Sequence, residues 1–122
     1  MHFLAVFIGG GIGSLLRYTL TLFTSTYFGS KGAIIGTLLS NIFACLLLGL
    51  VIYVFKDKLN TSSFFYPFLT VGVCGGFSTF STFSNQTVEL INQKMYGLVS
   101  LNILFSFLIC LGLLYFLSKQ QG

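Results

Sequence analysis

The sequence predicts an all-α membrane protein with four transmembrane helices, and three observations favour this fold class. Hydrophobic residues make up 55% of the 122 positions and charged residues only 7%, whereas soluble domains carry about 25% charged residues. The apolar residues form four long segments separated by short polar connections. One crossing needs about 20 apolar residues, so the length allows at most four. We expect a single transmembrane domain over residues 1–122, crossing the cell membrane several times and contacting lipid.

The first segment, from about Phe3 to Phe28, combines glycines with one arginine. Gly9 and Gly13 are four residues apart, a spacing that lets another backbone approach closely. Arg17 lies near the middle of the segment, where insertion scales assign an arginine a cost of about 2.5–3.5 kcal/mol. Two interpretations stay open: Arg17 attracts anions at a vestibule, or it lies near a membrane interface.

The second segment, from about Ala33 to Phe55, is uncharged and contains one amide side chain. Gly32 and Gly36 again have the spacing of a close helix contact. Asn41 needs hydrogen-bond partners, because an unpaired amide in hydrocarbon is costly. It either lines a pore or joins two helices.

The third segment begins near Phe64, ends near Asn92, and contains the most unusual stretch of the chain, Gly72–Ser84. Two adjacent glycines, Gly75 and Gly76, precede alternating hydroxyl and phenyl side chains. We predict a helix that is broken at these glycines near the membrane midplane and then resumes. A β-strand would also fit the alternation, but an open strand edge is not tolerated in lipid.

The fourth segment, from about Gly97 to Ser118, is uncharged and places Asn102 and Ser106 on one face. With four crossings, both chain ends and the second connection share one side of the membrane. The lysines divide almost equally between the two sides, with Lys56, Lys58 and Lys119 on one side and Lys31 and Lys94 on the other. Orientation normally follows a Lys/Arg excess, so the sequence predicts dual topology and an antiparallel dimer.

A broken helix at membrane depth offers groups that could bind ions. Carbonyls at a helix break lose their helical donors, and unwound carbonyls coordinate Na⁺ in membrane proteins. We expect the carbonyls of Gly75 and Ser78 from two subunits to hold one Na⁺. The edges of aromatic rings carry partial positive charge, so an anion could pass Phe80 and Phe83 edge-on. The polar groups expected beside this path are the Asn41 amide and the hydroxyls of Ser81 and Thr82.

Several other functions are disfavoured by the composition. The basic residues do not cluster, so nucleic-acid binding is not expected. The sequence has one histidine, His2, and no Ser-His-Asp, Cys-His or metal-ligand spacing, which argues against an enzyme. The three cysteines, Cys45, Cys74 and Cys110, lie in apolar runs and are expected to be packing residues.

Three motifs resemble the Fluc (CrcB-type) family of small dual-topology fluoride channels. They are Gly9–Tyr18, Gly36–Asn41 and Gly75–Ser84, in the order and layout of that family. The resemblance implies passive fluoride efflux that lowers cytoplasmic fluoride, two antiparallel pores per dimer and a central structural Na⁺. The partner subunit would be an identical chain or a second Fluc subunit.

The resemblance also implies roles for individual residues. The Na⁺ site corresponds to the backbone of Gly75 and Ser78. The pore residues correspond to Asn41, Phe80, Phe83, Ser81 and Thr82, with Asn102 and Ser106 as a possible extension of the polar track and Arg17 as the family arginine. Two positions depart from the family pattern: Gln86 stands where glutamate is common, and Ser40 stands where valine is frequent.

Two alternative functions remain open from the sequence. A small multidrug-type transporter would need a carboxylate inside the membrane, and the only acidic residues are Asp57, in a connection, and Glu89, near a segment end. A structural membrane subunit without transport of its own is the other alternative.

Overall fold

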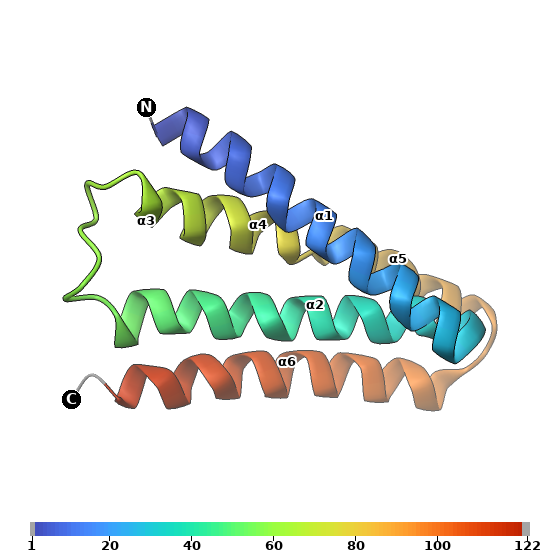
Figure 1. The fold of residues 1–122 in the computed structure, drawn as a ribbon. Coiled ribbons are helices and arrows are strands. Elements are labelled where there is room, and N and C mark those ends of the chain that lie inside the picture. Colours follow the sequence, from blue (N-terminus) through green and yellow to red (C-terminus); the bar gives the residue numbers. More distant parts are fainter. Residues whose placement is uncertain (1, 121–122) are drawn as a thin grey trace.

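The structure is a computed structural model that describes residues 2–120, and these residues form helices without any strand among them (Figure 1). In chain order the helices are α1 (His2–Phe28), α2 (Gly32–Gly49), α3 (Phe65–Pro67), α4 (Cys74–Phe77), α5 (Phe80–Asn92) and α6 (Tyr96–Lys119). Two π-helical stretches, Leu50–Val54 and Phe68–Val73, extend α2 and join α3 to α4. The predicted all-α fold class is confirmed.

Long apolar helices account for much of the chain. Two stretches, His2–Val54 and Tyr96–Lys119, are apolar and long enough to cross a membrane, and the first contains both α1 and α2. The boundaries of α1, α2 with its π-helical extension, and α6 lie close to those expected from the sequence. The boundaries of these segments could therefore be predicted from hydrophobicity and length alone.

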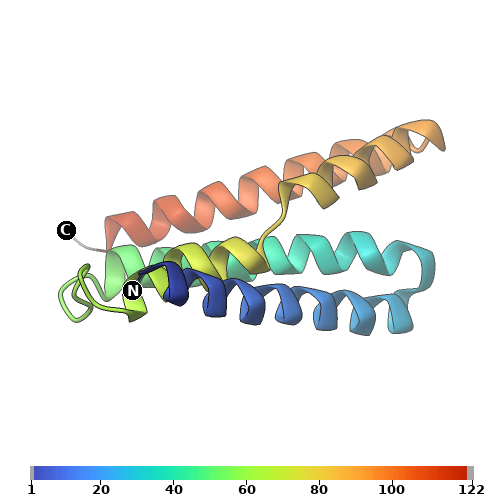
Figure 2. The same cartoon turned by 90° about the horizontal axis from the view of Figure 1, so that it is seen from above.

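The third segment differs from the others because it changes its packing partner along its length. Its first part, from α3 to α4, packs mainly against α1, whereas α5 packs mainly against α6, and α2 contacts both parts. Figure 2 shows the step in the chain between α4 and α5 that moves the segment from one neighbour to the other. Both described chain ends and the connection between α2 and α3 lie at the same end of the molecule (Figure 1).

Glycines allow α1 and the first part of the third segment to touch backbone to backbone. A Cβ atom added at Gly9 would collide with the carbonyl oxygen of Phe68, and one at Gly13 would collide with that of Val73. On the other side of the contact, a Cβ added at Gly76 would collide with the Gly10 carbonyl oxygen. The close approach expected of these glycines in α1 is confirmed, and we call this contact the glycine seam.

The turn between α1 and α2 is equally compact. Gly29 adopts a positive φ of 70°, which glycine tolerates without steric cost. The buried Thr24 hydroxyl donates a hydrogen bond of 2.6 Å to the carbonyl oxygen of Gly32. A Cβ added at Gly36 would approach the Cα of Thr21 to 2.9 Å. The predicted close contact at Gly32 and Gly36 is therefore confirmed, with α1 as the partner.

The glycine seam gives a first testable prediction. Gly13→Val should lower the stability of the protein by about 1–3 kcal/mol or more, the usual cost of overpacking, because its side chain would occupy the position of backbone atoms. Gly11→Val is the matched control, since nothing lies within 4 Å of a Cβ at Gly11. Thermal unfolding of detergent-solubilised protein, followed by circular dichroism, measures both. Equal melting temperatures for the two variants would contradict the seam.

Candidate functional site

The third segment is interrupted at Ser78 and Thr79. Both residues are extended, with φ/ψ of −87°/158° at Ser78 and −156°/122° at Thr79. The helix resumes at Phe80 because Thr79 caps it: the Thr79 hydroxyl oxygen accepts a 3.2 Å hydrogen bond from the Thr82 amide. The sequence predicts the break at Gly75 and Gly76. That position is wrong, because both residues are helical in α4.

A capping hydroxyl explains why the interruption lies after the glycines rather than at them. Ser and Thr side chains offer the backbone an alternative partner and favour helix starts. Gly76 instead contributes to packing, because the absence of a Cβ leaves room for the backbone of α1 in the glycine seam. Chain flexibility at the glycines was therefore the wrong signal for the break.

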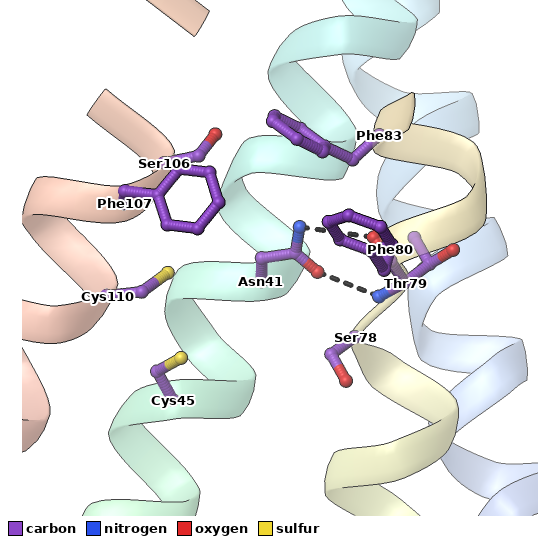
Figure 3. Close-up of a pocket in the computed structure, with 9 residues that line it drawn as sticks. All are labelled: Asn41, Cys45, Ser78, Thr79, Phe80, Phe83, Ser106, Phe107 and Cys110. Atoms are coloured by element: carbon purple, nitrogen blue, oxygen red, sulfur yellow. Dashed lines mark hydrogen bonds between the residues drawn. The ribbon is translucent and has the colours of Figure 1, made fainter. Parts of the chain in front are cut away.

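Asn41 of α2 pairs with the interrupted backbone. Its Oδ1 accepts a 2.8 Å hydrogen bond from the Thr79 amide, and its Nδ2 donates a 3.4 Å bond to the Thr79 carbonyl (Figure 3). One side-chain amide thus supplies both partners to a residue that has left the helix. Of the two roles considered for Asn41, the structure supports the contact between helices and also places the side chain at a cavity.

The same contacts deprive two carbonyls of their helical donors. In a continuous helix the Thr79 amide would bond to the Gly75 carbonyl, and the Thr82 amide would bond to the Ser78 carbonyl. Here the Thr79 amide bonds to Asn41 and the Thr82 amide bonds to the Thr79 hydroxyl. The Gly75 and Ser78 oxygens are left with capacity for other partners.

Arg17 reaches the interruption from α1. Its Nε donates a 3.1 Å hydrogen bond to the Gly76 carbonyl, and the side chain is half-buried. The carbonyl end of a helix carries partial negative charge, so the guanidinium stabilises the end of α4. This contact gives the arginine one hydrogen-bond partner inside the bundle, near the middle of α1.

A cavity of about 240 Å³ opens beside the interruption, between α2, α5 and α6 (Figure 3). Its lining residues are Asn41, Cys45, Ser78, Thr79, Phe80, Phe83, Ser106, Phe107 and Cys110. Among the described residues the buried Ser106 hydroxyl has no hydrogen-bond partner. The cavity is mainly apolar, with a few polar groups from α2, α6 and the interruption.

Three phenyl rings form a cluster at this cavity. The Phe83 and Phe107 centroids are 6.1 Å apart with an interplanar angle of 82°, an edge-to-face contact. The Phe80 centroid is 5.9 Å from that of Phe83. Phe83 is only 8% exposed, whereas Phe80 is 73% exposed in the single chain. The inner ring is fixed by its neighbours, and the outer ring is free on one side.

Comparison with known proteins identifies the family. The family model described as "CrcB-like protein, Camphor Resistance (CrcB)" matches residues 4–117. This chain belongs to the CrcB-like family. A relative from Phocaeicola vulgatus, named fluoride-specific ion channel FluC, is 43% identical over 76% of this chain and 75% of its own length. A relative of the same name from Shewanella oneidensis is 36% identical over 93% of this chain and 90% of its own length. Another, from Shewanella frigidimarina, is 37% identical over 92% of this chain and 89% of its own length.

The family membership and the apolar helices make this CrcB-like chain an integral membrane protein. The structure brings together five of its predicted site residues at the cavity: Asn41, Ser78, Phe80, Phe83 and Ser106.

The other predicted site residues of the CrcB-like chain lie outside this cavity. Thr82 lines a second hollow of about 290 Å³ with Gln86 and Glu89. Asn102 lines a third and donates a 3.4 Å hydrogen bond to the Thr87 hydroxyl. Ser81 and Gly75 are exposed in the single chain. Asn102 and Ser106 share a helix face, as expected, but they open onto different hollows.

Sequence reasoning missed four residues of the cavity in this CrcB-like chain: Thr79, Cys45, Phe107 and Cys110. A signal existed for two of them. Cys45 follows Asn41 by four residues and Cys110 follows Ser106 by four, so each shares a helix face with a predicted site residue. Their assignment as packing residues overlooked this spacing.

The pairing of Asn41 with Thr79 gives a second prediction for the CrcB-like protein. Asn41→Leu should lower stability by about 1–3 kcal/mol, because it leaves the half-buried Thr79 amide without its hydrogen-bond partner. Asn102→Leu is the matched control, because the Thr87 hydroxyl keeps its 2.8 Å bond to the Phe83 carbonyl. Thermal unfolding in detergent measures both variants. A larger loss for Asn102→Leu would contradict the role assigned to Asn41.

Proposed function

We propose that this CrcB-like chain forms a fluoride-selective ion channel in the cell membrane, through which fluoride leaves the cell passively and cytoplasmic fluoride falls. One observation carries the proposal: curated relatives that align with about nine-tenths of this chain are named fluoride-specific ion channels. These names also agree with the prediction that the protein is not an enzyme.

The cavity beside the interruption has a chemistry that suits a small anion. Phe80 and Phe83 provide rings whose edges carry partial positive charge. Asn41 uses one Nδ2 hydrogen for the Thr79 carbonyl, and the second is available because a primary amide has two. The unpartnered Ser106 hydroxyl could donate as well. Together these groups could replace part of the hydration shell of fluoride.

The proposed assembly is an antiparallel dual-topology dimer of four-crossing subunits, each with its third helix broken at the midplane. Two exposed features support a partner subunit: the Phe80 ring and the backbone at Gly75. The lysine count of three against two provides little orientation bias. Such a dimer, of identical chains or with a second Fluc subunit, would contain two antiparallel pores.

The residues at the break also fit a structural Na⁺. The Gly75 and Ser78 carbonyls have lost their helical donors, and oxygen atoms are the ligands that hard cations prefer. Bound there, Na⁺ would supply positive charge that favours a nearby anion. The Asn41 pairing and the Thr79 cap leave the two carbonyls without helical donors, whereas Arg17 uses the Gly76 carbonyl between them.

Halide efflux from liposomes that contain only this protein tests the proposal. We expect rapid fluoride efflux, measured with a fluoride electrode, and no comparable chloride efflux. Equal efflux of both halides would contradict selectivity. Protein that releases no fluoride would contradict a channel made of this chain alone, and proton-coupled uptake of an organic cation would instead support a multidrug-type transporter.

Substitution of the outer ring gives a further prediction. Phe80→Ile should strongly reduce fluoride efflux in the same liposomes, because isoleucine has no positive ring edge. Phe7→Ile is the matched control, since Phe7 of α1 is also exposed, at 78%, and lines none of the three hollows described above. The dimer should persist in both variants. Efflux that is unchanged by Phe80→Ile would remove this ring from the pathway.

A further inference from the structure

Two cysteines from different helices line the cavity beside the interruption. Cys45 lies on α2, one turn beyond Asn41, and Cys110 lies on α6, one turn beyond Ser106. Figure 3 shows both thiols on the cavity side of their helices. The two helices pack directly against each other, and both residues line the same cavity. Both are free thiols and half-buried, so neither is sealed in the core.

The surroundings of the pair restrict what it could bind. Among residues 2–120 no group of three or more His, Cys, Asp or Glu side chains is placed to hold a metal ion. Zn²⁺ sites normally use four protein ligands or three with a water, so this pair suits an ion that is satisfied by two. Thiol ligands select soft metals. A soft ion with a preference for two-fold coordination meets both conditions.

We propose that Cys45 and Cys110 form a two-thiol site for a soft divalent metal ion, with Hg²⁺ as the matching ion. On binding, each S–H bond is replaced by an S–Hg bond, and two protons leave to water. The product is neutral, because two thiolates balance one divalent ion. Neutrality matters here, since charge is expensive inside a membrane. A monovalent soft ion would leave a net negative charge.

Because two thiols of one chain bind the same ion, the site should hold Hg²⁺ more tightly than a single cysteine does. Once one thiol has bound the ion, the second is held beside it, so closure of the site is intramolecular and favoured by a high effective concentration. A single cysteine lacks this advantage and should lose Hg²⁺ to a competing monothiol. The bound ion would join α2 to α6 and occupy space beside Asn41 and Phe107.

If the cavity carries fluoride, as the proposed function requires, Hg²⁺ at this site should block efflux. The inference about block thus rests on the proposed function, whereas metal binding by the thiol pair does not. Each can therefore be measured separately.

Binding is tested on the purified protein with mercuric chloride in the presence of excess glutathione. We expect about one Hg²⁺ per chain, seen as thiolate-to-mercury absorbance, and protection of two thiols from alkylation by a maleimide. Cys45→Ala and Cys110→Ala should each lose this retention. Cys74→Ala is the matched control, because the buried Cys74 does not line the cavity. The site would be overturned if Cys45→Ala or Cys110→Ala still retained Hg²⁺. It would also be overturned if Cys74→Ala lost it.

Efflux from liposomes tests the block, with each variant compared with its own flux before mercury. The wild type and Cys74→Ala should lose most of their fluoride efflux and recover it with dithiothreitol, whereas Cys45→Ala and Cys110→Ala should resist. Equal inhibition of all four proteins would overturn the inferred block. Absence of fluoride efflux before mercury is added would count against the proposed function alone, since the binding measurement stands without it.

Discussion

One side-chain amide in α2 replaces a hydrogen bond that a helix would otherwise make with itself. Inside a membrane no water is present to satisfy a backbone that leaves the helix, so protein groups must do so. Asn41 meets this requirement at Thr79 with both its oxygen and its nitrogen. The interruption of the third segment can persist in an apolar environment because this pairing exists.

Much of the architecture follows from the interruption. Before it, the third segment lies against α1, where glycines on both sides bring the backbones together. After it, α5 lies against α6, and Phe83 packs edge-to-face with Phe107. A straight helix could not serve both neighbours. The change of direction opens the cavity and gathers residues from α2, α5 and α6 around it (Figure 3).

Features set by local chemistry could be predicted from the sequence, and features set by specific partners could not. Length and hydrophobicity gave the extents of α1 and α6, and glycine spacing gave the close contacts at Gly9 and Gly36. The position of the break was missed because it depends on Asn41, a residue 38 positions away from Thr79. Asn102 and Ser106 share a helix face, yet they open onto two hollows, because different residues of α2 and α5 lie opposite them.

The location of the chain ends has a consequence for protein engineering. Both described ends lie at the same end of the helical bundle (Figure 1). Two copies fused head to tail through a short flexible linker would therefore be forced into the same orientation. A fused pair of inverted copies needs an additional hydrophobic helix in the linker, which carries the chain back across the bilayer before the second copy begins.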